Sequence, residues 1–301
     1  MKNPIAKALV PVAGLGTRLM PATKSQPKEM LPVGRKPAVQ YVVEELQAAQ
    51  LSQILLITGR RKRSIEDHFD AEPELIAALE QAGNESALDD LKFLANGASQ
   101  FFYTRQSVQG GLGHAVALGK EFVGSDNCVV ALGDSLIAAA DPAAPIRAMM
   151  AAHIDLGAAA VIAVEQVPPQ DTHRYGIIAV NGAAPPPGEP VAVTNIIEKP
   201  PAGTAPSTMA VAARYIFNPA IFDALERTAP GRKGEIQLTD AIGELIRMGQ
   251  PVYAWLLPPD QRRYDVGNFE SYFRTFIDFA LADERYGYMV RQYIKAKAYE
   301  L

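Results

Sequence analysis

The amino-acid sequence predicts an α/β fold built on a mainly parallel sheet flanked by helices. Short apolar runs that end in glycine or aspartate suit buried strands, and segments with apolar residues at helical spacing suit the helices that cover them. The two kinds of segment alternate along much of the chain. Such alternation favours right-handed crossovers and a Rossmann-like parallel sheet covered on both faces.

The first half of the chain supplies most of this alternation. Residues 6–12 form an apolar run that ends in glycines, and Pro37 opens a stretch whose apolar side chains repeat at helical spacing. The acidic, alanine-rich stretch 74–95 contains Gly83 and Asn84, so it predicts two surface helices rather than core. The predicted strands are 6–12, 53–59, 100–104, 127–134 and 158–165, and the predicted helices are 37–50, 64–69, 74–95, 113–123 and 142–155.

A β-rich insertion at about 170–217 interrupts the alternation. Its strands are expected at 175–180, 191–200 and 209–217, joined as hairpins through a proline-rich connection. After helices at 219–228 and 238–248 and a strand at 252–257, residues 269–301 carry an amphipathic stripe rich in aromatics. We therefore expect an α/β domain at 1–260, which includes the insertion, and C-terminal helices at 261–301 that cover the domain or form an oligomer contact.

Composition limits the classes of function. The 301 residues are 48% hydrophobic, enough for a sizeable core, and 29 basic against 33 acidic residues give a net charge of -4. No global positive field therefore indicates a nucleic-acid or membrane partner. The single Cys128 and the scattered histidines indicate neither an internal disulfide nor a zinc pattern. No apolar run approaches the roughly 20 residues that span a bilayer, so we expect a cytoplasmic protein.

The segment VPVAGLGTRLMPATKSQPKEMLP at 10–32 places basic residues and glycines directly after the first strand, which indicates an anion site. It does not match a dinucleotide fingerprint, because Leu19 stands where the third glycine belongs and prolines prevent a helix from starting. The stretch from Gly113 to Lys120 has the wrong spacing for a Walker loop and continues with Glu121. For the G-x-G-T-R motif alone, a plain tight turn with solvated basic residues remains the alternative.

Taken with further segments, this motif resembles the sugar nucleotidyltransferases, most closely the bacterial UTP:glucose-1-phosphate uridylyltransferases. The resemblance implies a nucleotide-diphospho-sugar transferase fold, with the β-rich insertion as its sugar-binding part. It implies transfer of uridylyl from UTP to α-D-glucose 1-phosphate with Mg²⁺ as cofactor, which gives UDP-glucose and pyrophosphate. The matching segments follow the family's order over nearly the whole chain, at 11–46, GLGHAV at 111–116, YGII at 175–178, IIEKP at 196–200, GEIQLTDAI at 234–242 and YDVGN at 264–268.

The resemblance assigns the glycine-containing loop to the nucleotide. Glycines let backbone N–H groups approach phosphates closely and form an anion-binding concavity. Arg18 is expected to face the triphosphate and Lys28 to stabilise the charge of the departing pyrophosphate, although Lys28 taken alone reads as a solvated lysine. The residues implied for this loop are Ala13, Gly14, Gly16, Thr17, Arg18 and Lys28, of which Arg18 and Lys28 are also catalytic.

By the same resemblance, the segment RQSVQGGLGHA at 105–115 is expected to select the base. By resemblance, Gln106 hydrogen-bonds the uracil edge together with a backbone group of Gly111, and Gln109 is the competing glutamine. Gly110 stands where the family usually has a lysine. Without the resemblance, Gln106 is a polar residue at a strand end with no special role.

Two aspartates are the implied metal ligands. Asp134 follows a buried strand at its carboxyl end, where open α/β sheets place ligands, and Asp265 follows the strand at 252–257 by a short loop. Mg²⁺ typically takes one or two protein carboxylates and fills its other positions with water and phosphate. The resemblance makes Asp134 catalytic and both aspartates metal-binding. The alternatives are a turn after Gly133 and a helix cap near Asn268.

The sugar phosphate is expected beneath the β-rich insertion. By resemblance, Gly176 makes a backbone contact to the sugar, Glu198 accepts hydrogen bonds from its hydroxyls, and Lys199 holds the phosphate. Neighbouring strand residues point in opposite directions, so Glu198 and Lys199 can share a site only where the strand ends, as Pro200 indicates. A surface Glu–Lys pair is the alternative.

The implied reaction is an in-line attack of the sugar phosphate on the α-phosphorus of UTP, which needs no protein nucleophile. Two other functions stay open: a nucleotidyltransferase with another base or hexose specificity, and a catalytically weak regulatory homologue. We expect UTP and glucose 1-phosphate as ligands, no nucleic-acid or membrane partner, and a homo-oligomer, either a dimer or a tetramer.

Overall fold

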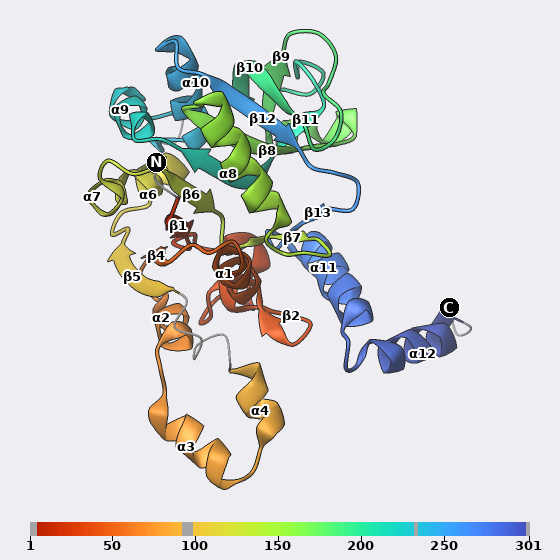
Figure 1. Cartoon of the computed structure of the whole chain (residues 1–301). Coiled ribbons are helices and arrows are strands. Elements are labelled where there is room, and N and C mark those ends of the chain that lie inside the picture. Colours follow the sequence, from red (N-terminus) through yellow and green to blue (C-terminus); the bar gives the residue numbers. More distant parts are fainter. Residues whose placement is uncertain (1–4, 92–98, 232–233, 299–301) are drawn as a thin grey trace.

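The computed structural model describes residues 5–91, 99–231 and 234–298. Within them the chain forms a nine-stranded sheet in the order β5-β4-β1-β6-β11-β8-β12-β10-β9 (Figure 1). The strands are β1 (Lys7–Pro11), β4 (Gln53–Thr58), β5 (Gln100–Arg105), β6 (Cys128–Ala131), β8 (Ala160–Gln166), β9 (Gly176–Val180), β10 (Pro190–Glu198), β11 (Met209–Phe217) and β12 (Val252–Leu256).

Helices cover both faces of the sheet, as predicted. Strand β1 illustrates why, since Leu9 faces one hydrophobic cluster while Ala8 and Val10 face the other. The cluster around Leu9 is completed by α6, α9 and α10, and the cluster around Val10 by α1, α2 and α8. The helices are α1 (Ala38–Ala48), α2 (Arg63–Phe69), α3 (Pro73–Gln81), α4 (Glu85–Asp90), α6 (Gly111–Ala117), α7 (Lys120–Val123), α8 (Ala144–Leu156), α9 (Ala220–Arg227), α10 (Leu238–Arg247), α11 (Phe269–Ala282) and α12 (Gly287–Ala298).

The helix expected at 113–123 begins at Gly111 and is divided into α6 and α7. The C-terminal helices expected at 261–301 are α11 and α12. Between them the carboxylate of Asp283 accepts backbone N–H groups of Arg285 and Tyr286. The surface helices predicted at 74–95 are α3 and α4, and residues 92–95 and 299–301 lie outside the described residues.

The sheet is mixed rather than mainly parallel, which corrects the prediction. Strands β5, β4, β1 and β6 are parallel neighbours, and β8 is parallel to β12. Strand β11 lies between these two groups and is antiparallel to β6 and β8, and β10 is antiparallel to both β12 and β9. The strands of 170–217 are therefore part of the central sheet and do not form a separate one. Strand β11 pairs with β6 and β8, and β10 pairs with β12.

Strand β11 contains a bulge. Its register shifts between Val211 and Tyr215, and Ala213 has a left-handed φ of 60°. Arg214, in the same bulge, is fully buried and donates to both carboxylate oxygens of Glu45 in α1, at 2.9 and 2.6 Å. It also donates to the carbonyl of Ser135 at 2.9 Å. The bulge thus ties helix α1 to the segment that follows β6.

A short ribbon, which the sequence pattern did not predict, lies beside the sheet. Strand β7 (Ser135–Ala138) pairs antiparallel with β13 (Arg262–Asp265). A second ribbon joins β2 (Pro32–Val33) to β3 (Lys36–Pro37). A third hydrophobic cluster, which contains Leu136 and Val266, packs α11 against both ribbons. From there α11 and α12 extend away from the sheet (Figure 1).

None of the helices in the described ranges is both long and apolar enough to cross a bilayer.

Candidate active site

Two pockets meet at Asp134. We call the first the carboxylate pocket: it has a volume of about 370 Å³ and contains both predicted metal ligands. The second, the glycine-loop pocket, has a volume of about 260 Å³. Of the predicted residues, the carboxylate pocket is lined by Arg18, Asp134, Gly176, Glu198, Lys199 and Asp265, and the glycine-loop pocket by Ala13, Gly14, Lys28, Gln106, Gly111 and Asp134.

Two predicted residues do not line either pocket. Gly16 has a left-handed φ of 66°, and its carbonyl accepts a hydrogen bond from the hydroxyl of Thr23 at 2.7 Å. Gly16 therefore contributes to the conformation of the loop. Thr17 begins a 3-10 turn, η1 (Thr17–Leu19), and lines a different hollow on the surface.

The β7–β13 ribbon brings the two aspartates together. Ser135 lies directly opposite Asp265 in the ribbon, and the backbone N–H of Val266 donates to the carbonyl of Asp134 at 2.8 Å. Gly267 follows closely, and a side chain there would overlap the Asp265 carboxylate and crowd Arg18. The ribbon therefore fixes two carboxylates that are far apart in sequence at the mouth of one pocket.

Lys28 forms an ion pair with Asp134 between the two pockets. Burial alone would lower the pKa of Lys28, but Asp134 and then Glu29 raise it above its usual value. Burial would likewise raise the pKa of Asp134, but the ammonium of Lys28 holds it below the usual range. Asp265 differs, because burial and the neighbouring charge of Asp134 both raise its pKa. The two aspartates thus differ, since Lys28 pairs with Asp134 directly, whereas burial decides the direction of the shift at Asp265.

The glycine loop is held from two sides. The side chain of Lys28 runs beneath it, so that a β-carbon at Gly14 would lie 3.4 Å from Cε of Lys28. Gln109 donates from Nε2 to the carbonyl of Ala13 at 3.1 Å. Lys28 itself belongs to a 3-10 turn, η2 (Lys28–Met30), which is anchored where buried Glu29 accepts a hydrogen bond from Lys62 at 2.6 Å.

Gln106 closes the end of the glycine-loop pocket. It is 4% exposed, and its Nε2 donates to the carbonyl of Gly111 at 3.0 Å and lies 2.9 Å from Nδ1 of His114. The amide nitrogen is therefore occupied, whereas its Oε1 has no hydrogen-bond partner within the described part of the chain. Gln106 and Gly111 lie together as the resemblance implied.

The opposite wall of the carboxylate pocket comes from the end of β10. The strand ends at Glu198, and Lys199 turns back with a left-handed φ of 44°. Its Nζ lies 2.9 Å from Oε1 of Glu198, whose Oε2 accepts the hydroxyl of Thr239 at 2.8 Å. Because the strand ends here, the side chains of Glu198 and Lys199 line one pocket. The sequence required such a strand end if the two residues were to share a site.

Sequence reasoning missed Arg263 in the carboxylate pocket. It is mostly buried, pairs with Glu165 at 2.5 Å and lies over the ring of Tyr175 at 4.9 Å. It stands two residues before Asp265 on β13, so its side chain lies on the same face of the ribbon. That spacing was visible in the sequence, but the strand itself was not predicted.

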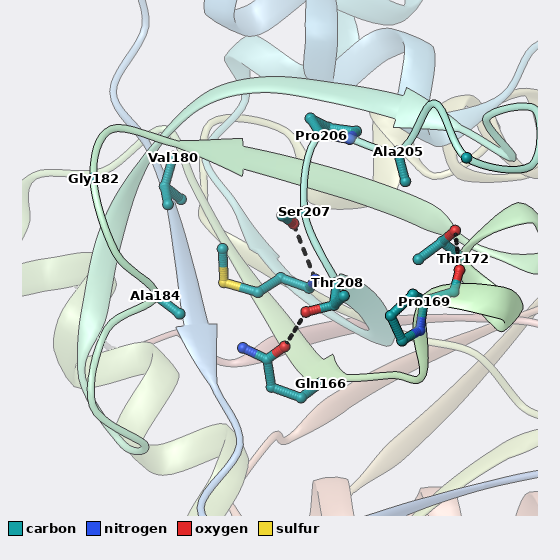
Figure 2. A pocket seen from close by; sticks show the side chains of 12 residues that line it. Gln166, Pro169, Thr172, Val180, Gly182, Ala184, Ala205, Pro206, Ser207 and Thr208 are labelled. Carbon is teal, nitrogen blue, oxygen red and sulfur yellow. Dashed lines mark hydrogen bonds between the residues drawn. The ribbon is translucent and has the colours of Figure 1, made fainter.

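A larger hollow, of about 500 Å³, lies apart from these pockets (Figure 2). Its described lining contains no charged side chain and none of the predicted site residues. Its Ser207 and Thr208 bond to the backbone nitrogen of Met209 and to Gln166. The hollow offers a ligand little specific chemistry, so we do not regard it as the active site.

The chain is similar to known proteins over nearly its whole length. Residues 7–280 match the nucleotidyl transferase family model. A UTP–glucose-1-phosphate uridylyltransferase 1 from Staphylococcus saprophyticus is 44% identical over 97% of this chain and 98% of its own.

Solved structures are also similar. A UTP-bound UGPase from Acinetobacter baumannii superposes with a TM-score of 0.88 at 37% identity, over 97% of this chain and 99% of that one. A UDP-glucose pyrophosphorylase complexed with UDP-glucose gives 0.82 at 34% identity, over 93% and 100%. The chain therefore belongs to the nucleotidyl transferase family, on the branch that contains the bacterial UTP–glucose-1-phosphate uridylyltransferases.

Proposed function

We propose that this protein transfers uridylyl from UTP to α-D-glucose 1-phosphate, with release of pyrophosphate. The observation that carries the proposal is the pair of pockets joined at Asp134, one lined by a glycine loop and the other by cations and carboxylates. The names of the similar proteins, which include UTP-bound and UDP-glucose-bound structures, support the same substrates.

Asp134 and Asp265 are the proposed ligands of Mg²⁺. Their chemistry fits the ion, since both are carboxylates and the ribbon holds them in one pocket. Burial first, and then the charge of Asp134, raise the pKa of Asp265. Mg²⁺ typically takes one or two protein carboxylates and keeps water and phosphate among its other ligands. When bound, the ion would neutralise phosphate charge and hold the reacting groups in line.

The glycine-loop pocket is proposed to hold UTP. Backbone groups of Ala13 and Gly14 are proposed to face the phosphates, together with Lys28, which lines the same pocket beside Asp134. Gly16 and Thr17, which the resemblance also assigned to the nucleotide, lie outside this pocket. The free Oε1 of Gln106 can accept a hydrogen bond from N3–H of uracil, with Gly111 contributing a backbone contact. Cytosine has no hydrogen at N3, so this arrangement favours uracil over cytosine.

The carboxylate pocket is proposed to hold glucose 1-phosphate. Gly176 allows a backbone contact to the sugar, Glu198 accepts from sugar hydroxyls, and Lys199 attracts the phosphate. Arg18, which the resemblance assigned to the triphosphate, lines this pocket rather than the glycine-loop pocket, so we propose that it contacts the sugar phosphate instead. Arg263 adds a buried cation that is pre-oriented by Glu165. Every proposed sugar contact thus lies on the other side of Asp134 from the nucleotide contacts.

The chemistry is an in-line displacement without a protein nucleophile. An oxygen of the sugar phosphate attacks the α-phosphorus, and the bond to the bridging oxygen breaks as pyrophosphate leaves with the electron pair. The attacking oxygen is already ionised at neutral pH, so the protein must align two anions and neutralise their repulsion. Alignment of two bound reactants alone can contribute roughly 7–11 kcal/mol.

A thymidylyltransferase is the second candidate, because thymine also presents N3–H to Gln106. A pyrophosphate-release assay over UTP, dTTP, CTP and GTP, each with several hexose 1-phosphates, tests both. The proposal predicts the highest kcat/KM for UTP with glucose 1-phosphate. A higher value for dTTP would favour the second candidate, and no pyrophosphate with any pair would favour a regulatory homologue.

The proposal also covers the domain division, the assembly and the cellular location of the protein. We divide the chain into a catalytic domain at 1–260 and C-terminal helices at 261–301, although β13 and Asp265 of the second part complete the carboxylate pocket. Exposed apolar side chains on α11 and α12 support a homo-oligomer contact there, and sedimentation analysis tests it. A cytoplasmic location agrees with buried, unpaired Cys128. The exposed apolar side chains are Phe273, Phe276, Ile277, Tyr288, Met289, Tyr293 and Ile294.

A further inference from the structure

The amide of Gln106 is held by a neighbour that lies outside the two central pockets. His114, the fourth residue of α6, is half-buried, and its Nδ1 lies 2.9 Å from Nε2 of Gln106. His114 is absent from the described lining of both pockets. It can therefore influence a bound nucleotide only through Gln106, as a positioning residue.

Two acceptors determine which way the Gln106 amide points. Its Nε2 carries two hydrogens, and the atoms that face it are the carbonyl oxygen of Gly111 at 3.0 Å and Nδ1 of His114. The carbonyl oxygen only accepts, so Nε2 rather than Oε1 takes the place beside it. Because the amide nitrogen only donates, Nδ1 of His114 must accept, and the imidazole proton lies on its Nε2.

Burial makes this arrangement costly to change. Gln106 is 4% exposed, and its backbone N–H donates to the carbonyl of Thr58 at 2.8 Å, which fixes the start of the side chain. A half-turn of the amide would place Oε1 against the Gly111 carbonyl and leave both hydrogens of Nε2 without these acceptors. Only Oε1 is therefore presented to the glycine-loop pocket.

Gly110 provides the space that the imidazole occupies. A β-carbon at Gly110 would lie 2.7 Å from both Cγ and Nδ1 of His114, so any other residue there would push the ring away. Gly110 has a φ of -96°, which residues with a β-carbon adopt readily. The glycine is thus required here for space next to the ring and not for its backbone conformation.

The turn that carries both acceptors is fixed from its other side. The N–H of Gly113 donates to the carbonyl of Ile236 at 2.8 Å, and the N–H of Ile236 donates to the carbonyl of Gly110 at 2.7 Å. A β-carbon at Gly111 would lie 2.6 Å from the Ile236 carbonyl, so the two segments are in close contact. The start of α6 therefore holds the Gly111 carbonyl and the His114 ring in place.

We propose that His114 is a specificity-determining residue, because it accepts one hydrogen of the Gln106 amide and so keeps Oε1 directed at the base. The inference rests on the proposed function, since the base is that of the nucleotide substrate. Uracil donates from N3–H to Oε1, whereas cytosine presents an acceptor at N3. Without His114, one buried N–H of Gln106 lacks a partner, and the amide is free to turn an N–H toward cytosine.

The test compares two replacements of His114 by initial-rate kinetics with UTP and with CTP, each at saturating glucose 1-phosphate. His114→Asn is smaller but places an amide oxygen near the position of Nδ1, so it keeps an acceptor. His114→Leu fills a similar volume without any acceptor. If His114 serves only for packing, the leucine variant should be the better enzyme, because volume-conserving changes are tolerated best. The two roles thus predict opposite orders.

We expect His114→Leu to raise the KM for UTP about tenfold and to lower the ratio of kcat/KM for UTP over CTP about tenfold, with kcat nearly unchanged. His114→Asn should retain the wild-type KM and ratio. Calorimetric titration of UDP-glucose should give the same order of Kd without turnover. A wild-type KM for UTP in His114→Leu overturns the proposal, as does a larger effect in His114→Asn than in His114→Leu.

Gly110→Ala is a second variant that leaves His114 itself unchanged. Its β-carbon would displace the ring, so it should reproduce the effects of His114→Leu and decides the question should that variant fail to fold by circular dichroism. Gly243→Ala is the matched control, since its β-carbon would come no closer than 3.6 Å to another side chain. A wild-type KM for UTP in Gly110→Ala contradicts the proposal.

Failure of the proposed function is recognised separately, in the wild-type protein. It would then release no pyrophosphate from UTP and would not bind UDP-glucose in its own titration. A wild-type preference for dTTP leaves the inference testable, because thymine also carries a hydrogen at N3, and dTTP with dCTP then replaces UTP with CTP.

Discussion

The two central pockets differ in what builds their walls. The glycine-loop pocket is formed by backbone and by charged side chains that are paired, as Lys28 is with Asp134 and Glu29 with Lys62. The carboxylate pocket is lined by side chains at strand ends, and its Lys199 is 60% exposed. Changes on the nucleotide side should therefore disturb the fold and catalysis together, whereas changes on the sugar side should alter substrate affinity more selectively.

The largest effect is expected at Asp134, which both pockets share. Asp134→Asn should lower turnover by about 10³-fold, because the anion that faces the cation is lost. Lys28 would remain buried without its partner, so the free energy of unfolding should fall by about 3–5 kcal/mol. Pyrophosphate release and thermal denaturation measure the two effects. Asp126→Asn, at a surface pair with Lys7, should change neither, and near wild-type turnover of Asp134→Asn would remove this residue from the mechanism.

The next largest effect is expected at Lys28. Lys28→Met should lower kcat by about 10²-fold, because the cation proposed to meet the leaving diphosphate is lost. It should also raise the affinity for Mn²⁺ without nucleotide, since Asp134 would lose the ammonium that is paired with it. Electron paramagnetic resonance of free Mn²⁺ measures that affinity. Unchanged Mn²⁺ binding would mean that the Lys28–Asp134 pair does not compete with a metal.

Gly267→Ala tests how precisely the ribbon positions its carboxylate. A β-carbon there would overlap the Asp265 carboxylate, so we expect kcat/KM to fall about 10- to 100-fold with little loss of stability. Gly243→Ala is the control, because its β-carbon would meet only ordinary contacts in α10. Equal activity in the two variants would show that the position of Asp265 matters little.

The smallest effect is expected at Lys199, on the exposed wall. Lys199→Ala should raise the KM for glucose 1-phosphate about tenfold and leave the KM for UTP nearly unchanged. Initial-rate kinetics with each substrate varied in turn make the measurement, and Arg247→Ala, at another exposed pair, is the control. A rise confined to the KM for UTP would indicate that Lys199 contacts the nucleotide and not the sugar phosphate.

Much of the fold was predictable because it depends on local patterns. Continuous apolar runs predicted the strands of the sheet, and Gly83 with Asn84 predicted the division between α3 and α4, where Asn84 indeed accepts a backbone N–H as a cap. The order of the strands was not predictable, because nothing in the local pattern of 209–217 indicates that β11 pairs with β6 and β8.

The candidate site shows the same contrast between local patterns, which the sequence reveals, and long-range contacts, which it does not. Some residues within one motif, such as Gln106 with Gly111 or Glu198 with Lys199, line a pocket together, whereas Gly16 and Thr17 line neither pocket. Arg263 and Arg214 were missed, since their importance depends on partners that are distant in sequence, Glu165 and Glu45. Such pairs are invisible to spacing arguments, which compare residues only with their neighbours along the chain.

The β7–β13 ribbon also has a consequence for biosynthesis. Asp265 lies opposite Ser135 in the ribbon, but it follows every strand of the nine-stranded sheet along the chain. A growing polypeptide that has already folded most of this sheet therefore still lacks the second carboxylate. Translation must proceed past Gly267 before the acidic centre closes. The nascent chain is therefore expected to remain inert until Gly267 has emerged from the ribosome, whatever the folding state of the earlier strands.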